Sequence, residues 1–507
     1  MTGKKIMDVK RLAQVVTEAR HQGKRVVHCH GVFDFLHIGH IRYFEQARAM
    51  GDVLVVTLTP DRFVDKGPHR PAFTETLRVE AIASLSCVDY VAINEWPTAE
   101  ETLQLIHPDI YVKGSEFKNI QADMTGKIAR EEKVARDLDI RLAFTDDIVF
   151  SSTSLINRFI SVYPQEVNEY LDLFRNRHPR DDVLAVIDRM ATLKVLVIGD
   201  VIVDEYVYCE AIGKFSKDPV LAVKYLSEDR FAGGVLAVAN YVANFAGQVE
   251  LISVLGNRNH YEPFIRAALN KKIKPDFFTV EGIPTVVKRR ILDGYSLNKL
   301  IEIYDLDERE LPPAVSEAIC TTIRERAAKA DVVLISDFGH GAINDQITET
   351  LCETAPFLAI NTQANVGNRG FHTISRYPRA DYACIAEHEM RLEARDARGE
   401  LRPILEQTCR RLKARYMIVT RGQWGCLVSG AGDEFAAVPA FACKVVDRAG
   451  AGDAFLAVTA LAAAQKIPFE VLGFIGNVVG AEAVEIVGND KAIDKLKIKK
   501  CIVSLLK

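Results

Sequence analysis

The chain has 507 residues, and a single hydrophobic core stops growing at roughly 250–300 residues, so the length predicts at least two domains. The net charge of −4 is small and the basic residues are scattered, which argues against a surface for nucleic acid or an anionic membrane. The ten cysteines form no C-x-x-C pair, the longest apolar run (454–464) is too short to span a bilayer, and no signal segment is visible. We therefore expect a cytoplasmic protein in a reducing compartment.

The first part of the chain alternates amphipathic helices with short apolar strands. The pattern predicts a helix over 8–23, a strand over 25–30, a helix over 39–50 and a strand over 53–58. The last of these strands is apolar throughout, as is typical of strands buried in parallel sheets. This order predicts a βαβ unit, and the same pattern continues to about residue 159.

The middle of the chain, residues 161–192, is polar and helical in character, and we interpret it as a helical linker. A second series of strands and helices begins with the apolar strand 193–200 and ends in a Gly/Ala-rich helix after Gly450. Alternating strands and helices predict an α/β fold with mainly parallel sheets in both parts. We therefore expect a domain over 1–160, a linker over 161–192 and a second domain over 193–507.

A first candidate site follows the strand 25–30, where the sequence reads Gly-Val-Phe-Asp-Phe-Leu-His-Ile-Gly-His. His37 and His40 stand at a strand-to-helix junction, where free backbone N–H groups and the helix dipole attract phosphate. Both imidazoles would donate hydrogen bonds to a phosphorus centre that gains charge during in-line attack, and Gly39 allows close approach. An isolated histidine pair equally suits a metal or a structural role, but the complete string favours phosphate.

This string resembles the nucleotidyltransferase superfamily that includes glycerol-3-phosphate cytidylyltransferases and the adenylyltransferase part of bacterial heptose-activating enzymes. The resemblance covers about residues 25–160 and includes Arg70-Pro71, the YVKGSEF segment and the FSSTSLI segment. It implies a Rossmann-like domain in which a substrate phosphate attacks the α-phosphorus of ATP or CTP, assisted by Mg²⁺. It implies catalytic roles for His37, His40 and Lys113, and nucleotide contacts from Phe33, Gly39, Arg78, Ser152 and Thr153.

A second candidate site is the string Asp-Arg-Ala-Gly-Ala-Gly-Asp-Ala-Phe at 447–455. The small residues Gly450, Ala451 and Gly452 leave a row of backbone N–H groups at a helix start, which forms an anion hole for a phosphoryl group. Asp453 is placed to take the proton from an attacking hydroxyl. Such Gly/Ala-rich helix starts also serve close packing.

The second string resembles the signature of the ribokinase-like (PfkB-type) sugar kinases, and the likeness covers about residues 193–490. The family commonly pairs through a lid sheet, so a homodimer is a further expectation. The resemblance implies catalysis by Asp453 and a metal-binding Glu389. It also implies sugar or phosphate contacts from Asp200, Asp204, Gly233, Gly234, Asn240, Lys288 and Arg290, and nucleotide contacts from Thr420, Gly422, Gly425, Gly450, Ala451 and Gly452.

The second domain departs from that family at three places. Ala386 replaces the asparagine of an N-x-x-E element, residues 361–363 read Asn-Thr-Gln instead of Asp-Pro-Lys, and Arg448 replaces a threonine. These changes leave open whether the kinase part turns over.

The two parts together resemble bifunctional bacterial heptose kinase/adenylyltransferases, with the order of the parts reversed. They imply a sugar kinase joined to a sugar-phosphate nucleotidyltransferase that makes an ADP-heptose-like sugar for surface polysaccharide, from small-molecule substrates only. The alternative is a cytidylyltransferase for a polyol or glycerol phosphate, with a kinase-like part that only senses sugar or oligomerises.

Overall fold

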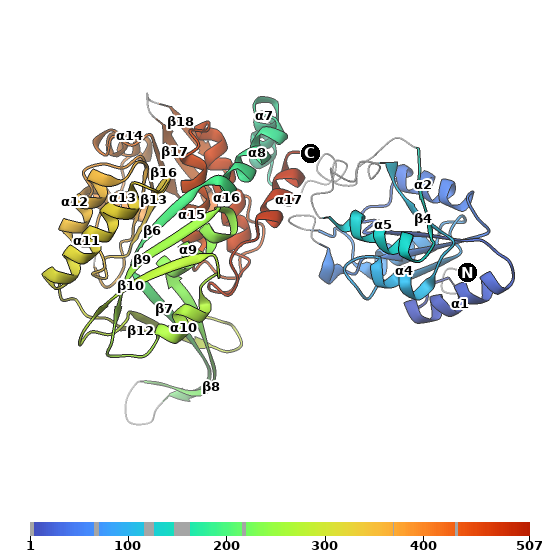
Figure 1. Cartoon of the computed structure of the whole chain (residues 1–507), viewed down its shortest axis with the longest axis horizontal. Coiled ribbons are helices and arrows are strands. Elements are labelled where there is room, and N and C mark those ends of the chain that lie inside the picture. The colour runs from blue at the N-terminus through green and yellow to red at the C-terminus, as the bar shows by residue number, and fades with distance from the viewer. Residues whose placement is uncertain are drawn as a thin grey trace. The chain divides into compact units, whose positions relative to one another are not determined.

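The computed structural model describes residues 5–64, 70–115, 126–146, 163–214, 220–368, 370–430 and 434–507. The chain divides into two compact units, one formed by Met1–Pro164 with Val503–Lys507 and the other by Gln165–Ile502 (Figure 1). None of the helices in the described ranges combines the length and the apolar character required for a membrane crossing. Each unit is described by itself.

The first unit is a parallel sheet flanked by helices. Its described strands are β1 (Val26–Gly31), β2 (Val53–Leu58), β3 (Tyr90–Ile93), β4 (Ile110–Lys113) and β5 (Arg141–Phe144). Its described helices are α1 (Val9–His21), α2 (Ile38–Arg48), α3 (Glu75–Ala83), α4 (Glu100–Ile106) and α5 (Lys127–Asp137), with a 3-10 turn at Asp61–Phe63. The strands pair in the order β3-β2-β1-β4-β5, all parallel. This is the Rossmann-like arrangement that the sequence predicts.

The ends of these elements follow local signals. Asp8 caps α1 by accepting a hydrogen bond from the backbone N–H of Arg11. Every residue of β2 is buried, which agrees with its unbroken apolar sequence. The strand order reverses at β1, because β2 and β3 lie on one side of it and β4 and β5 on the other. Ligands of open parallel sheets bind beyond the carboxyl ends of the strands at such a reversal.

The second unit contains the remaining elements. Its described strands are β6 (Lys194–Gly199), β7 (Val201–Lys214), β8 (Leu221–Gly234), β9 (Gln248–Gly256), β10 (Ile273–Val280), β11 (Val287–Asp293), β12 (Lys299–Asp305), β13 (Val332–Asp337), β14 (Leu358–Thr362), β15 (Tyr382–Ala386), β16 (Tyr416–Thr420), β17 (Cys426–Gly430) and β18 (Phe435–Val438). Its described helices are α7 (Gln165–Arg177), α8 (Arg180–Arg189), α9 (Val235–Phe245), α10 (Glu262–Ala268), α11 (Pro313–Ala327), α12 (Asp345–Thr354), α13 (Glu387–Ala394), α14 (Leu401–Arg411), α15 (Ala451–Ala463) and α16 (Phe469–Ala483), and α17 (Lys495–Leu505) follows them.

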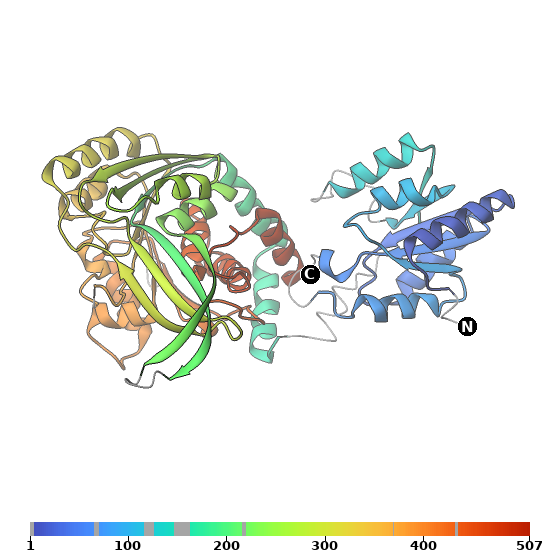
Figure 2. The same ribbon diagram turned by 90° about the horizontal axis from the view of Figure 1, so that it is seen from below.

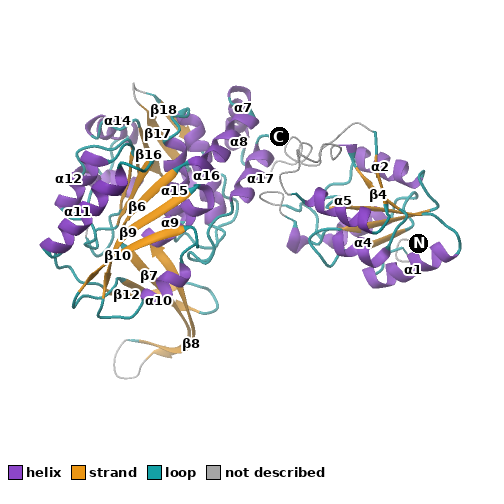
Figure 3. Ribbon diagram, in the orientation of Figure 1, coloured by secondary structure: helices purple, strands orange, loops and turns teal. Residues whose placement is uncertain are grey.

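The larger sheet of this unit, within the described residues, has the order β10-β9-β6-β13-β14-β15-β16-β17-β18. The strands are parallel from β10 to β16, and β17 and β18 run antiparallel at one edge. Helices cover both faces (Figure 3). Alternate residues of β6 and β13 pack with α11, α12 and α14 into one apolar core, while α9 and α15 contact the same strands from the other face. The predicted α/β class is therefore confirmed.

A smaller sheet forms a lid in the order β12-β11-β7-β8. The long antiparallel pair β7–β8 extends beyond the larger sheet (Figures 1 and 2). Strand β11 runs parallel to β7, and this register sets Lys288 beside Asp204. The lid strands thus carry several of the predicted substrate residues toward the carboxyl end of β6.

The stretch expected as a linker is ordered into α7 and α8. The ring of Phe174 in α7 stacks on Phe474 in α16, with the ring centroids 4.3 Å apart. His178 and Glu470 lie 2.8 Å apart at the end of the same contact. In the described residues these helices therefore pack as part of the second unit.

Candidate functional sites

The H-x-G-H turn lies directly beyond the carboxyl end of β1. Phe33 adopts a left-handed backbone conformation, with φ of 48°, and its ring packs against Phe44 at 5.0 Å between centroids. A methyl group on Gly31 would lie 2.9 Å from that ring, so only glycine allows the chain to fold back here. The turn therefore delivers the chain into α2 with both histidines at the edge of the sheet.

The two histidines form a stacked pair with ring centroids 4.0 Å apart. His37 caps α2, and its Nδ1 accepts a hydrogen bond of 3.1 Å from the backbone N–H of Gly39. Because Nδ1 is the acceptor, the neutral ring carries its proton on Nε2. Partial burial lowers the pKa of His37, which favours this neutral form. His37 is thus prepared to donate a hydrogen bond through Nε2.

Arg78, which is predicted to contact the nucleotide, is buried behind the motif turn. Its side chain is 1% exposed, and its guanidinium donates to the carbonyl oxygens of Phe73 and Thr59 and to Oδ1 of Asp61. A further donor bonds the carbonyl oxygen of Val32 inside the motif turn. Arg78 therefore holds the turn through these hydrogen bonds, and its predicted nucleotide contact stays a prediction.

The Arg70-Pro71 turn also supports the H-x-G-H turn, through contacts with Asp34. Arg70 pairs with Asp34 at 2.6 Å, and both side chains are buried. Asp34, the aspartate of the motif, also accepts from the backbone N–H of Ala72. The aspartate therefore binds the segment after β2 to the motif turn rather than facing solvent.

Lys113, the last residue of β4, lies next to the motif turn because β4 neighbours β1. Its Nζ lies 2.6 Å from Oε2 of Glu131 in α5, and both side chains are buried. Sequence reasoning did not single out Glu131, because it stands in a run of charged helix residues. Ser152 and Thr153, predicted to face the nucleotide, lie outside the described residues.

The second site is built around the start of α15. Gly450 caps this helix with φ of 78°, and a methyl group there would lie 2.1 Å from Oδ1 of Asn489. The first backbone N–H groups of a helix, here those of Ala451, Gly452 and Asp453, lack intrahelical partners. Burial and the negative charge of Asp204 raise the pKa of Asp453 to about 7, while Lys288 lowers it. A carboxylate with that pKa is suited to accept a proton near neutral pH.

The lid brings charged residues to this helix start. Arg290 pairs with Asp204 at 2.5 Å, and Lys288 is buried beside them. Burial lowers the pKa of Lys288. A methyl group on Gly233 would lie 2.1 Å from Oδ2 of Asp204, so the glycine of β8 makes room for this carboxylate. The structure therefore groups Asp204, Lys288 and Arg290 electrostatically with Asp453.

Asp200, which is predicted to contact a sugar hydroxyl, is bound to backbone N–H groups. Its two carboxylate oxygens accept hydrogen bonds from the backbone N–H groups of Phe338 at 2.8 Å and Ala342 at 2.9 Å. Burial, with the nearby charge of Asp337, raises its pKa to about 6. The buried carboxylate shapes the loop after β13. Gly234, in the turn into α9, has φ of 56° and is in close approach to the carbonyl of Asp200.

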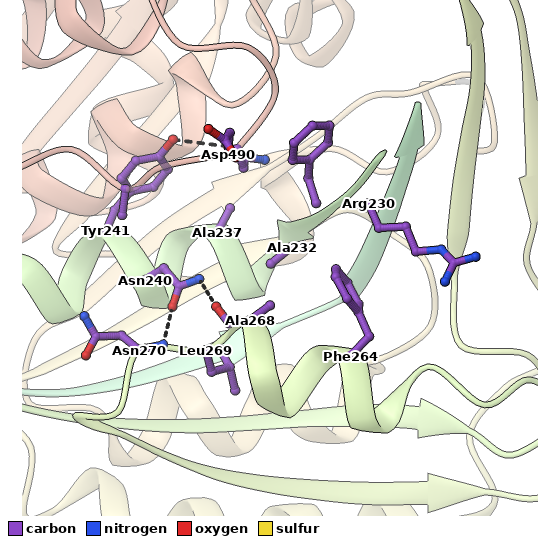
Figure 4. Close-up of a pocket in the computed structure, with 13 residues that line it drawn as sticks. Arg230, Ala232, Ala237, Asn240, Tyr241, Phe264, Ala268, Leu269, Asn270 and Asp490 are labelled. Carbon is purple, nitrogen blue, oxygen red and sulfur yellow. Dashed lines mark hydrogen bonds between the residues drawn. The ribbon is translucent and has the colours of Figure 1, made fainter. Parts of the chain in front are cut away.

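Asn240 also forms hydrogen bonds within the fold. Its amide donates to the carbonyl of Ala268 at 3.0 Å and accepts from the N–H of Asn270 at 2.8 Å (Figure 4). It lines a cavity of about 310 Å³ between α9, α10 and the segment around Asp490. The lining of that cavity includes none of Asp453, Asp204, Lys288 and Arg290. Asn240 therefore links α9 to the end of α10, and its predicted sugar contact stays a prediction.

The nucleotide turn follows β16. Thr420 ends that strand, and Gly422 and Gly425 have φ of 56° and 79° in the turn to β17. A methyl group on Gly425 would lie 2.0 Å from the carbonyl oxygen of Val438, so this glycine is required by close backbone approach. These residues form the strand-turn that the sequence predicts, at the edge where the sheet becomes antiparallel.

Glu389 is the residue predicted to bind Mg²⁺. It is buried at the start of α13, and its carboxylate accepts from the N–H groups of Ala386 at 2.6 Å and Ala364 at 3.1 Å. Burial raises its pKa. A carboxylate has further lone pairs, and Mg²⁺ is commonly held by one or two carboxylates together with substrate phosphates. Glu389 therefore fits the role of a single protein ligand.

A buried cluster around Asp337 was not foreseen. Asp337 ends β13, and its carboxylate contacts His372 at 2.7 Å, Tyr377 at 2.6 Å and Arg376 at 3.1 Å. These partners hold its pKa below the usual range despite burial. An aspartate at a strand end gave the only sequence signal, because its partners come from a loop that has no recognisable pattern.

Comparisons with known proteins agree with this division. Residues 192–495 match the pfkB family carbohydrate kinases, and residues 28–159 match the cytidylyltransferase-like family. Both predicted resemblances and their order along the chain are confirmed. A "Bifunctional protein HldE" of Citrifermentans bemidjiense is 36% identical over 162 residues, which cover 31% of this chain and 32% of the relative. Another, of Syntrophotalea carbinolica, is 42% identical over 108 residues, or 21% of this chain and 22% of the relative.

These matches span about a third or less of the length of the curated relatives. Among solved structures, phosphofructokinase-2 from Escherichia coli in complex with potassium aligns with a TM-score of 0.51 at 13% identity. The alignment covers 62% of this chain and 100% of that one. At that identity the likeness supports the fold alone.

Proposed function

Since the chain belongs to the pfkB family of carbohydrate kinases and carries a cytidylyltransferase-like segment, we propose that it is a bifunctional enzyme. The kinase part, over 193–507, phosphorylates a sugar or sugar phosphate. The transferase part, over 1–160, joins a sugar 1-phosphate to a nucleotide. The product is a nucleotide-activated sugar, ADP-heptose-like, for surface polysaccharide. The observation that carries the kinase half is the raised pKa of Asp453 at a helix start beside Asp204 and Lys288.

In the kinase reaction, the carboxylate of Asp453 takes the proton from the attacking hydroxyl. The hydroxyl oxygen then bonds the γ-phosphorus of ATP, and ADP leaves. Backbone N–H groups of Ala451 and Gly452 stabilise the charge on the transferring phosphoryl group. Asp204 positions the sugar, while Lys288 and Arg290 attract its phosphate where the substrate carries one. Mg²⁺ supplies charge neutralisation at the nucleotide phosphates, and Glu389 would hold it.

In the transferase reaction, a phosphate oxygen of the sugar 1-phosphate attacks the α-phosphorus of ATP or CTP. The bond to the β-phosphate oxygen breaks, and pyrophosphate leaves. His37 donates from Nε2 to an α-phosphate oxygen as its charge grows, and the stacked His40 acts beside it. No covalent bond to the protein is needed.

We also propose a homodimer that forms through the lid sheet. Leu300, Ile301 and Ile303 of β12 are 42%, 58% and 46% exposed. Apolar side chains of β8, among them Tyr225 and Leu226, are also exposed. A second copy of this chain would bury such a surface.

The purified chain is assayed with ATP and a panel of heptoses, hexoses and their phosphates, with ADP as the readout. A second assay combines sugar 1-phosphates with ATP or CTP and follows pyrophosphate. If no sugar yields ADP while CTP and a polyol phosphate yield pyrophosphate, the alternative function replaces the proposal. Pyrophosphate release that persists in His37→Ala would contradict the transferase assignment.

A further inference from the structure

The transferase unit contains a buried polar layer on one side of its sheet. His28 and His30 of β1 both contact the hydroxyl of Thr57 in β2 at 2.8 Å, and Thr59 lies 3.2 Å from Nε2 of His30. His28 also stacks on Tyr111 of β4, with ring centroids 5.3 Å apart. Parallel sheets normally bury apolar residues on both faces, so the buried polar side chains of this layer require an explanation.

The layer ends at a buried ion pair. Oε2 of Glu131 lies 2.6 Å from Nζ of Lys113 and accepts a hydrogen bond of 2.9 Å from the hydroxyl of Tyr111. Its other oxygen accepts from the backbone N–H of Ala99 at 3.1 Å. The partners of this carboxylate thus come from β4 and from Ala99, the residue before α4, while His28 of β1 stacks on Tyr111. Separating this buried carboxylate from its partners costs free energy, because breaking a buried ion pair leaves an uncompensated charge.

The position of the pair links it to the nucleotide site. Lys113 ends β4, next to β1, and β1 leads into the H-x-G-H turn. The ammonium therefore lies at the reversal of strand order where ligands of such sheets bind. A lysine at that edge meets phosphate as a point charge with three N–H donors.

We propose that Glu131 is the positioning residue of the transferase site, fixing Lys113 so that its ammonium meets the nucleotide phosphates while it remains paired with the carboxylate. This inference rests on the proposed transferase function. It assigns to Glu131 a role that acts only through Lys113. The polar layer beneath serves to orient Tyr111, which in turn holds Glu131.

Other titratable groups near the pair do not change charge between pH 6 and pH 9. Burial lowers the pKa of His30 to about 4 and that of His28 well below its usual value. Burial raises the pKa of Cys29 to about 12 and that of Tyr111 well above its usual value. Lys113 and His30 hold the pKa of Glu131 at about 2 against the effect of burial. Among the described residues, Lys127 at the start of α5 also acts on His30, and Tyr43 of α2 donates to the carbonyl oxygen of Val112.

The test is Glu131→Gln in the full chain, with pyrophosphate release followed from pH 6 to pH 9. Without the carboxylate, Lys113 loses the partner that fixes its ammonium. The KM for the nucleotide should therefore rise by about tenfold with little change in kcat, because a contact to the phosphates is misplaced. An unchanged KM, or a loss confined to kcat, overturns the proposal.

A matched control is Glu132→Gln, the next residue of α5, whose carboxylate pairs with the exposed Arg136. It should leave both the rate and its pH profile unchanged. If Glu131→Gln does not fold, Glu131→Asp takes its place, because it keeps the charge but withdraws the carboxylate by one methylene group. A raised KM with little change in kcat then supports the proposal, and an unchanged KM overturns it.

Nucleotide binding separates this inference from the function on which it rests. Calorimetry with ATP and with CTP measures the affinity of wild type and variants without turnover. If the wild type binds nucleotide but releases no pyrophosphate with any partner, the transferase function fails. In that case weaker binding by Glu131→Gln than by wild type still supports the role of Glu131, and equal binding overturns it.

Discussion

Gly233 of β8 and Asp204 of β7 approach so closely that a methyl group on the glycine would lie 2.1 Å from the carboxylate oxygen of Asp204. The carboxylate is held there by Arg290. It also contributes to the raised pKa of Asp453. Gly233 therefore determines the position of Asp204, which is proposed to bind the substrate.

Gly233→Ala should displace Asp204 and reduce ADP formation by tenfold or more, because a misplaced contact near the reacting groups costs on the order of 10²-fold. Steady-state assays measure the effect. Gly480→Ala in α16 is the control, since a methyl group there meets only an ordinary contact of 3.7 Å with Phe455. Equal activity in Gly233→Ala and wild type would contradict the positioning of Asp204.

The rate of ADP formation should rise with pH through about 7, because Asp453 accepts a proton only when it is ionised. Asp453→Asn should lose about 10²–10⁴-fold of this activity and the rising limb with it. The measurement is kcat against pH from 5.5 to 8.5.

Asp453→Asn should lower activity without lowering stability at pH 8. The folded state holds the proton of Asp453 more tightly than the unfolded chain, so its stability falls as pH rises from about 4 toward 7. Asp453→Asn removes this loss, and its melting temperature at pH 8 should equal or exceed that of wild type. A lower melting temperature at pH 8 would show that the carboxylate stabilises the fold instead.

His37→Asn separates catalysis from helix capping. Asparagine keeps an oxygen that can accept from the N–H of Gly39, and it is a favoured capping residue, so the unit should stay folded. It lacks the imidazole Nε2–H, and pyrophosphate release should fall by about 10²–10³-fold, as when one oxyanion donor is removed. Circular dichroism measures whether the unit stays folded, and the pyrophosphate assay measures the loss of catalysis.

Arg78→Lys tests the contribution of Arg78 to the stability of the motif turn. Lysine cannot reproduce the guanidinium fork that reaches Thr59, Phe73 and Asp61, so the free energy of unfolding of the first unit should drop by about 2–3 kcal/mol. Arg136→Lys, at an exposed pair, should change it little. Chemical denaturation followed by fluorescence measures both variants.

Ile301→Glu on the exposed face of the lid tests the homodimer. A charge in an apolar interface should shift the chain toward monomer, and light scattering across protein concentrations measures the change. A wild type that is monomeric at every concentration would refute the pairing.

Both candidate sites at helix starts could be predicted from local sequence patterns. The apolar strands, the H-x-G-H string and the Gly-Ala-Gly-Asp string each depend on neighbours in the chain, and parallel strands order such turns at one edge of a sheet. The positions of His37 and Asp453 could therefore be anticipated. The hydrogen bonds of Arg78, Asp200 and Asn240 to the backbone could not, since motif resemblance does not say which backbone groups will need a side-chain partner.

The order of strands, helices and motifs along the chain was sufficient to predict a transferase-like and a kinase-like α/β part, and to locate the two turns proposed to bind phosphate. The contacts that support those turns are evident only in the folded chain. Glu131 meets Lys113, and Asp200 meets the loop after β13, through contacts between distant segments. Buried polar groups must find partners wherever the fold brings them, and that requirement is set by packing in three dimensions.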